Sequence, residues 1–312
     1  WIMAYTTIDD PSAYFKVQLY TGDGSADHAI TFDDTDTDMQ PDLVVIRQRD
    51  ATVGGNCWFD SVRGATKLLL SNTDAVETTD ADTLDSFASD GFQVDADTKV
   101  NDNTKLYASW NWKESATAGF DIVSYTGNGT DDTDISHNLS AVPKMILVKN
   151  RDADDAWQIY HGANTSSPET DYLDFGNPSP ATVDAADRWS DEAPTSSVFT
   201  LGDGAEVNTD TENYIAYCFA EKQGYSKFGG YEGNADADGI FVYTGFRPAF
   251  VLSKSIDSTH DWQLWDNKRS GYNEDNDMVV PSNTDAENAS TFVDLLSNGF
   301  KWRTSTAAGP NV

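Results

Sequence analysis

Clusters of carboxylates are the side chains of this sequence whose type and spacing best suit chemistry, and that chemistry is calcium binding. The first cluster consists of Asp33, Asp34, Asp36 and Asp38, and the second of Asp131, Asp132 and Asp134. Calcium prefers hard oxygen ligands on flexible loops. Neither cluster has the Asp-x-Asp-x-Asp-Gly spacing with a distant Glu that marks a calcium-binding hand. A solvated acidic loop without an ion is therefore the alternative, and the sequence implies no other cofactor.

A second candidate site consists of side chains that could contact a sugar. Trp189 lies between charged residues in a segment that is lengthened relative to its counterpart in the first third of the chain. An aromatic ring in an extended loop is well placed to stack on a ligand, because loops carry function while the scaffold carries stability. Tyr160 and His161 begin the same region. We predict a ligand contact at these three residues.

The sequence offers no constellation for catalysis. The histidines form no pair at metal-ligand spacing, and there is neither a G-x-S-x-G elbow nor a phosphate-binding glycine loop. With so many acids, a carboxylate pair at glycosidase distance would arise by chance, so spacing alone does not indicate hydrolysis. The prediction is a protein without enzyme activity, and a glycan depolymerase is the alternative from another functional class.

The chain repeats one pattern along its length. Tyr20-Thr-Gly-Asp-Gly24 returns as Tyr125-Thr-Gly-Asn-Gly129 and, more loosely, as Tyr231-Glu-Gly-Asn-Ala235, at shifts of 105 and 106 residues. An apolar run led by a proline follows each turn, and these prolines are Pro41, Pro143 and Pro248. Self-similarity at a fixed period indicates a repeat architecture. We therefore predict a tandem array of three homologous modules.

The repeat also sets the domain boundaries. The first range covers residues 8–113, the second 114–222 and the third 223–312. Residues 1–7 resemble the closing strand of a preceding copy, and the third range stops before a closing strand of its own. The chain is thus expected to be a window from a longer polypeptide.

A tryptophan near the start of a short strand recurs in each range. These residues are Trp58, Trp157 and Trp262, which the sequence places at one position of the repeat. A core residue that every copy needs explains this recurrence better than a sugar platform does, so we assign the three tryptophans a structural role. Cys57 and Cys218 fall at different places in their ranges, which favours buried thiols over a repeated disulfide.

The composition is typical of short strands and turns. No long stretch keeps the apolar spacing of an amphipathic helix, so helices should be short and few. The strands predicted for the first range are Phe15–Tyr20, Ala29–Phe32, Leu43–Gln48, Cys57–Ser61, Lys67–Leu70, Ser86–Ala88, Phe92–Asp95 and Lys105–Trp112. This density of short antiparallel strands predicts an all-β fold, in which each module is a two-sheet β-sandwich, jelly-roll or lectin-like in outline.

The charge is strongly acidic. There are 52 Asp and Glu against 20 Lys and Arg, which gives a formal net charge of −32 and a pI near 4.1. Nucleic acid and an anionic membrane surface are therefore excluded as expected partners. No apolar run approaches the ~20 residues that a membrane span requires, so insertion is not expected either. The acidity instead favours solubility and resistance to association in salty surroundings.

A series of motifs resembles a repeated domain of tail-fibre and other virion structural proteins of tailed phages, marine ones in particular. The series comprises the Tyr-Thr-Gly-Asn-Gly turn, the His-x-Leu at His137-Asn-Leu139, the run from Pro143, and the segment from Trp58 to Lys67. The similarity covers essentially the whole chain, although the third range has Gly239-Ile-Phe-Val-Tyr243 in place of His-x-Leu. These motifs specify a structural module and bring no catalytic residue with them.

The resemblance implies a non-enzymatic protein on the virion surface, in a tail or capsid fibre, that takes part in host attachment. The implied partners are other virion proteins and a glycan or protein of the host surface. A homotrimer is expected, because tail fibres usually follow the symmetry axis of the tail. A pseudo-threefold monomer is the alternative oligomeric state, and a capsid-decorating fibre that only stabilises the particle is the alternative role.

Overall fold

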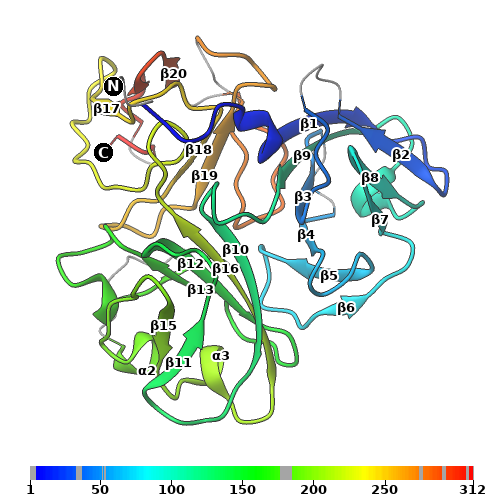
Figure 1. The fold of residues 1–312 in the computed structure, drawn as a ribbon. Helices are drawn as coiled ribbons and strands as arrows, with labels where there is room; N and C mark the ends of the chain where they lie inside the picture. Colours follow the sequence, from blue (N-terminus) through cyan, green and yellow to red (C-terminus); the bar gives the residue numbers. More distant parts are fainter. Residues whose placement is uncertain are drawn as a thin grey trace.

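The computed structural model describes residues 5–32, 37–50, 52, 54–175, 185–273, 277–289, 293–306 and 309–311. Strands predominate in these residues, which confirms the predicted all-β class. The helices described are single turns: η1 (Pro11–Ala13), α1 (Thr98–Asn101), η2 (Pro168–Thr170), α2 (Ala186–Trp189) and α3 (Ala205–Asn208). Figure 1 shows the three ranges as lobes around a common centre, the first in blue and cyan, the second in green and the third in yellow to red.

The strands follow the repeat. The first range contains β1 (Phe15–Thr21), β2 (His28–Thr31), β3 (Leu43–Gln48), β4 (Asn56–Asp60), β5 (Lys67–Leu70), β6 (Thr78–Thr79), β7 (Leu84–Ala88), β8 (Gly91–Val94) and β9 (Leu106–Trp112). The second contains β10 (Phe120–Thr126), β11 (Thr133–Ser136), β12 (Pro143–Asn150), β13 (Gln158–His161), β14 (Leu173–Asp174), β15 (Val198–Leu201) and β16 (Asn213–Ala220). The third contains β17 (Phe241–Tyr243), β18 (Phe250–Ser253), β19 (Gln263–Asp266), β20 (Val293–Leu296) and β21 (Gly299–Trp302).

Each range places an inner sheet against an outer sheet. The inner sheets have the strand orders β1-β9-β3-β4-β5-β6, β10-β16-β12-β13-β14 and β18-β19, and the outer sheets have the orders β2-β8-β7, β11-β15 and β17-β21-β20. Neighbouring strands pair antiparallel in all of them. This is the sandwich arrangement expected from the short alternating strands.

The inner strands are buried on both faces, and this explains their continuous apolar runs. In β3, Val44 and Ile46 pack toward the outer sheet, whereas Leu43 and Val45 pack toward the centre of the molecule. In β12, Ile146 and Val148 point outward in the same way and Leu147 points inward. A strand that faces water on one side would alternate apolar and polar residues. The runs after Pro41 and Pro143 do not alternate because neither face is solvated.

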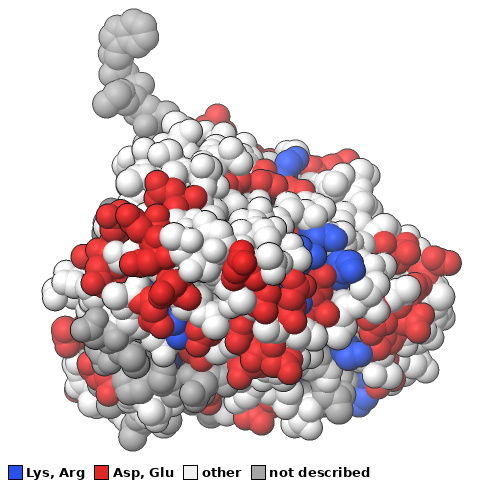
Figure 2. Space-filling model, turned by 90° about the horizontal axis from the view of Figure 1, so that it is seen from below, with Lys and Arg blue, Asp and Glu red and all other residues white. Residues whose placement is uncertain are grey.

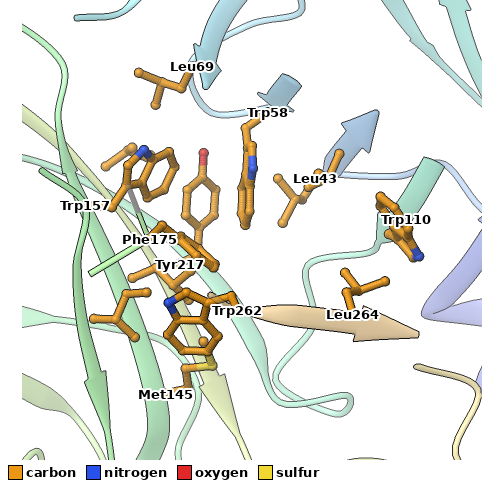
Figure 3. Close-up of a cluster of buried hydrophobic side chains, with 14 of the residues drawn as sticks. Leu43, Trp58, Leu69, Trp110, Met145, Trp157, Phe175, Tyr217, Trp262 and Leu264 are labelled. Carbon is orange, nitrogen blue, oxygen red and sulfur yellow. The ribbon is translucent and has the colours of Figure 1, made fainter. Parts of the chain in front are cut away.

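A central cluster joins all three ranges. Its buried members are Val17, Leu43, Val45, Trp58, Leu69, Ala108, Trp110, Phe120, Ile122, Met145, Leu147, Trp157, Ile159, Leu173, Phe175, Ile215, Tyr217, Trp262, Leu264 and Val279. Figure 3 shows Trp58, Trp157, Tyr217, Phe175 and Trp262 gathered at its middle. Each range also has its own outer cluster between its two sheets. The ranges are therefore separate sandwiches outside and one hydrophobic core inside.

The register of the inner sheets corrects the alignment of the tryptophans. Trp58 pairs with Val45, the fourth residue after Pro41. The residues paired at the matching places after Pro143 and Pro248 are Ile159 and Leu264. Counting back two residues along each strand, Asn56 holds the place of Trp157 and Trp262. The three tryptophans are all buried in the central cluster, but Trp58 occupies a different position of the repeat from the other two.

Side-chain donors at the matched position form a ring around the centre. The indole N–H of Trp157 donates to the carbonyl of Leu70 at 3.0 Å, and that of Trp262 donates to Asp174 at 2.7 Å. Asn56 completes the series, since its amide donates to Pro281 at 2.8 Å. Each range thereby contacts the one before it, and the first contacts the third.

Charged pairs follow the same direction. Arg151 makes a two-pronged contact with Glu77 at 2.8 and 3.0 Å, and Arg49 makes one with Glu287 at 2.8 Å for both bonds. The third range has Ile256 at the corresponding distance from its proline. Two of the three boundaries between ranges are therefore reinforced by an arginine.

An asparagine fixes the turn that identifies each repeat. Asn101 accepts a hydrogen bond from the backbone N–H of Asp23 at 2.9 Å, and Asn208 accepts one from Asn128 at 2.9 Å. Asn311 does the same for Asn234 at 3.3 Å. The turn glycines leave no room for a side chain: a Cβ on Gly22 would lie 2.2 Å from the carbonyl oxygen of Asp102. Glycine recurs here because the backbone approach requires it.

Candidate functional site

A cavity of about 720 Å³ opens beside β18 in the third range. Residues 225–233 line one side of it, residues 248–257 line the other, and aromatic rings of the central cluster form its floor. Phe228, Phe250 and Leu252 are partly exposed at this cavity and pack against the central cluster. A concave apolar site with few polar groups is the usual form of a ligand site.

Two polar side chains of the second range line this cavity, His161 and Asn164. Burial lowers the pKa of His161 to about 4, so the imidazole is neutral at pH 7, and its Nδ1 accepts a hydrogen bond from the N–H of Ala163 at 3.2 Å. Asn164 is only 2% exposed, and neither its Oδ1 nor its Nδ2 has a partner among the described residues. A buried amide without hydrogen bonds costs stability. The cavity thus has polar capacity that the described residues leave unused.

The counterparts of these residues in the other ranges form a buried ion pair. Strand register places His161 where the first range has Asp60 and the third has Asp266. Three residues later stand Asn164, Arg63 and Arg269 respectively. Arg63 pairs with Asp60, and the Arg269 Nε lies 2.6 Å from an oxygen of Asp266. The second range therefore lacks an ion pair that the other two ranges possess.

Trp189 and Tyr160 are core residues, which corrects the ligand contact predicted for them. Trp189 is 2% exposed and Tyr160 is 4% exposed, and the two rings meet edge to face with centroids 5.9 Å apart. Both belong to the outer cluster of the second range. The turn of α2 directs Trp189 inward, so the charged residues beside it in sequence do not indicate an exposed ring. Of the three predicted residues, only His161 lies at the cavity.

The acidic clusters divide between described and undescribed residues. Asp33, Asp34 and Asp36 lie outside the described residues, whereas Asp38 lies within them. Asp131, Asp132 and Asp134 are exposed, and two of them accept hydrogen bonds from hydroxyls: Asp131 from Ser190 at 2.8 Å and Asp134 from Thr200 at 2.9 Å. The part of the chain that the structure describes contains no group of three or more His, Cys, Asp or Glu placed to hold a metal ion. Both thiols, Cys57 and Cys218, are buried and free, as expected.

Comparison with protein families decides the assignment. The family model described as Domain of unknown function (DUF7483) matches residues 10–311. The chain belongs to the DUF7483 family. No curated protein and no solved structure matches it. The match spans all three ranges, so the DUF7483 domain as defined by this family corresponds to the whole ring and not to one repeat.

Sequence reasoning missed Asn164, Phe228 and Phe250 as residues of the cavity in this DUF7483 domain. A signal for Asn164 was present, because Asp-x-x-Arg recurs at Asp60 and Asp266 but reads His-x-x-Asn at His161. Without the strand register these segments could not be aligned. Among the described residues no helix is of the length and apolarity needed to cross a bilayer.

We expect the melting temperature of the DUF7483 domain to rise with sodium chloride. The Debye length shrinks from about 30 Å at 0.01 M to about 3 Å at 1 M ionic strength, so salt screens repulsion among the carboxylates. Calcium at fixed ionic strength separates a bound ion from screening, because a ligand stabilises by mass action. Scanning calorimetry measures both effects. An unchanged melting temperature across this salt series would contradict the repulsion, and an added rise with calcium would support the ion site.

Glu114 should make stability depend on pH. Burial, a hydrogen bond with Asp121 and repulsion from its charge raise the pKa of Glu114 from 4.5 to about 7. The folded state therefore holds a proton that the unfolded state loses, and stability falls as pH rises through this window. Urea unfolding should show Glu114→Gln gaining on the wild type from about pH 5 to about pH 8, while the exposed Glu192→Gln stays parallel. A constant difference between wild type and Glu114→Gln would disprove the shift.

Proposed function

We propose that this DUF7483 chain is a non-enzymatic structural protein of a virion surface, a tail-fibre component that contributes to attachment to a glycan or protein of the host. The resemblance of its repeated motifs to virion structural proteins supports the proposal. The observation that carries it from the structure is the use of buried polar groups for cohesion. Asn56, Trp157 and Trp262 each tie one range to the next. The scaffold is thus built for rigidity.

The surface is consistent with a protein displayed in salty water. On the face shown in Figure 2, Asp and Glu cover large areas, while Lys and Arg appear only in small groups. A surface of one sign keeps proteins apart at low ionic strength and soluble at high ionic strength. An acidic surface also repels nucleic acid and anionic lipid, which leaves neutral glycans and proteins as the favoured partners.

A homotrimer is part of this proposal, because a fibre on a tail shares the symmetry axis of the tail. Native mass spectrometry and light scattering in molar salt measure the oligomeric state directly. A monomer at micromolar concentration would remove the trimer and leave the threefold-like arrangement within one chain.

Labelling on particles tests the role itself. Antibodies raised against residues 8–311 should bind at the tail in electron micrographs of intact virions, and the isolated protein should bind host cells and block infection. Label confined to the capsid, without cell binding, would favour a decorating fibre. Release of reducing ends from host glycans by the isolated protein would replace the proposal with a depolymerase.

A further inference from the structure

The cavity beside β18 lies where the other two ranges hold a strand. In the first range β9 runs between β1 and β3, and in the second β16 runs between β10 and β12. The counterpart of β1 and β10 in the third range is residues 226–232, and the counterpart of β3 and β12 is β18. Among the described residues, β18 pairs only with β19, and no strand is assigned within 226–232.

Exposure at β18 reflects the unoccupied place. The inward residues of β3, Leu43 and Val45, are 0% and 5% exposed, and Met145 and Leu147 of β12 are 6% and 2% exposed. At the same two places β18 carries Phe250 and Leu252, both of which remain partly exposed. The apolar surface is therefore of the same kind, but the neighbour that covers it elsewhere is not there.

A tyrosine without its stacking partner marks the outer end of the cavity. Tyr20 stacks on Tyr107 of β9 with ring centroids 5.0 Å apart, and Tyr125 stacks on Tyr214 of β16 at 5.1 Å. Tyr231, their counterpart, meets Trp302 and Phe300 at tilted or edge-on angles instead. The place of Tyr107 and Tyr214 is thus vacant in the third range.

The inner end of the cavity lacks a hydrogen-bonding partner. Tyr217 of β16 donates to Asp60 at 2.7 Å, and Trp110 of β9 donates to Asp266 at 3.0 Å. Both donors belong to the strand that closes the following range. By the same rule, the strand that would close the third range meets His161 and Asn164. These are the residues whose polar atoms were left unsatisfied at the cavity, Oδ1 and Nδ2 of Asn164.

We propose that this cavity is an acceptor site for one added β-strand, a peptide segment from outside residues 5–312 with the pattern Tyr-x-x-(Trp/Tyr)-x-(Trp/Phe). The strand inserts antiparallel between residues 226–232 and β18. Its tyrosine stacks on Tyr231, its central aromatic residue bonds to the His161 and Asn164 pair, and its last aromatic ring joins the central cluster. β-Strand addition gives affinity through the backbone ladder and specificity through pockets for alternate side chains.

The probe is a synthetic peptide with the sequence of residues 105–113, Lys-Leu-Tyr-Ala-Ser-Trp-Asn-Trp-Lys. It should bind the folded protein, raise its melting temperature and slow hydrogen exchange at the amides of β18. Two peptides serve as controls: a scrambled sequence of equal charge, and the version with Ser109→Pro, which cannot complete the ladder. Both should bind at least about tenfold more weakly. Equal binding of the scrambled peptide, or no protection of β18, would overturn the proposal.

Variants of the protein locate the site. Leu252→Lys places a charge against the added strand and should abolish binding, whereas Val142→Lys, at a residue 41% exposed, should leave it intact. Asn164→Leu removes the unsatisfied amide and should weaken the probe while preserving the fold, which the melting temperature checks. If deleting residues 1–5 raises the affinity about tenfold or more, those residues are the occupant and the proposal fails. Full binding by Leu252→Lys would also refute it.

Discussion

Replacing Trp157 by alanine is expected to lower the free energy of unfolding by about 3 to 5 kcal/mol. The indole is fully buried, lies 5.1 Å from the ring of Trp58 and 6.2 Å from that of Tyr217, and donates a hydrogen bond to Leu70. Its removal therefore opens a void at the point where the ranges meet and leaves a carbonyl unpaired. Loss of this size is a large part of the total stability of a domain, commonly about 5 to 15 kcal/mol.

Urea unfolding of Trp157→Ala measures this loss, with Tyr243→Ala as the control, since Tyr243 is 62% exposed and should change stability by no more than about 0.5 kcal/mol. Binding to host cells should decline only as folding declines. A variant that keeps its stability but loses binding would make Trp157 a ligand platform and contradict its structural role.

Arg63→Met should destabilise the protein by a similar amount, about 3 to 5 kcal/mol. Arg63 and Asp60 are fully buried, and Arg63 also lies 3.2 Å from Glu77 and donates to the carbonyl of Trp58 at 3.0 Å. Methionine would fill much of the space but would leave the Asp60 carboxylate buried without its cation. The cost is therefore an unpaired charge and not a lost contact.

The double variant Asp60→Asn with Arg63→Met identifies the cause. It removes both charges, so it should recover most of the stability that Arg63→Met alone loses. Lys227→Met is the control, because Lys227 and Glu221 form a pair at 2.9 Å on the surface and such pairs are worth about 1 kcal/mol or less. A double variant as unstable as Arg63→Met would show that packing, and not charge, sets the effect.

The fold class and the strands of the first range were predictable because their residues alternate or run apolar between turn signals. Each predicted strand is found, within one or two residues for most of them, and Leu43–Gln48 and Lys67–Leu70 match without shift. β6, at Thr78–Thr79, was not predicted, since two exposed threonines give no periodic signal. Strand type is a local property, and local patterns were sufficient for it.

The candidate site was not predictable in the same way. Charged neighbours suggested an exposed Trp189, but the direction of a side chain depends on the turn that carries it and on what packs above. The recurrence of tryptophan suggested one shared position, whereas pairing placed Trp58 opposite Val45 and left Asn56 to match Trp157. The cavity arises from a pairing absent between residues 226–232 and β18 in the described chain. No composition or spacing in those segments records such an absence.

The ring of contacts between ranges also bears on how the chain reaches its native state. Asn56 bonds to Pro281 across 225 residues of sequence, and Arg49 meets Glu287 across 238. Long loops must close before such contacts form, and proteins with high contact order fold slowly for this reason. The joint between the first and third ranges is therefore the last part of the circle to assemble. Until it forms, the aromatic surface of the centre is exposed to solvent, and that interval is when the acidic exterior does most to prevent aggregation.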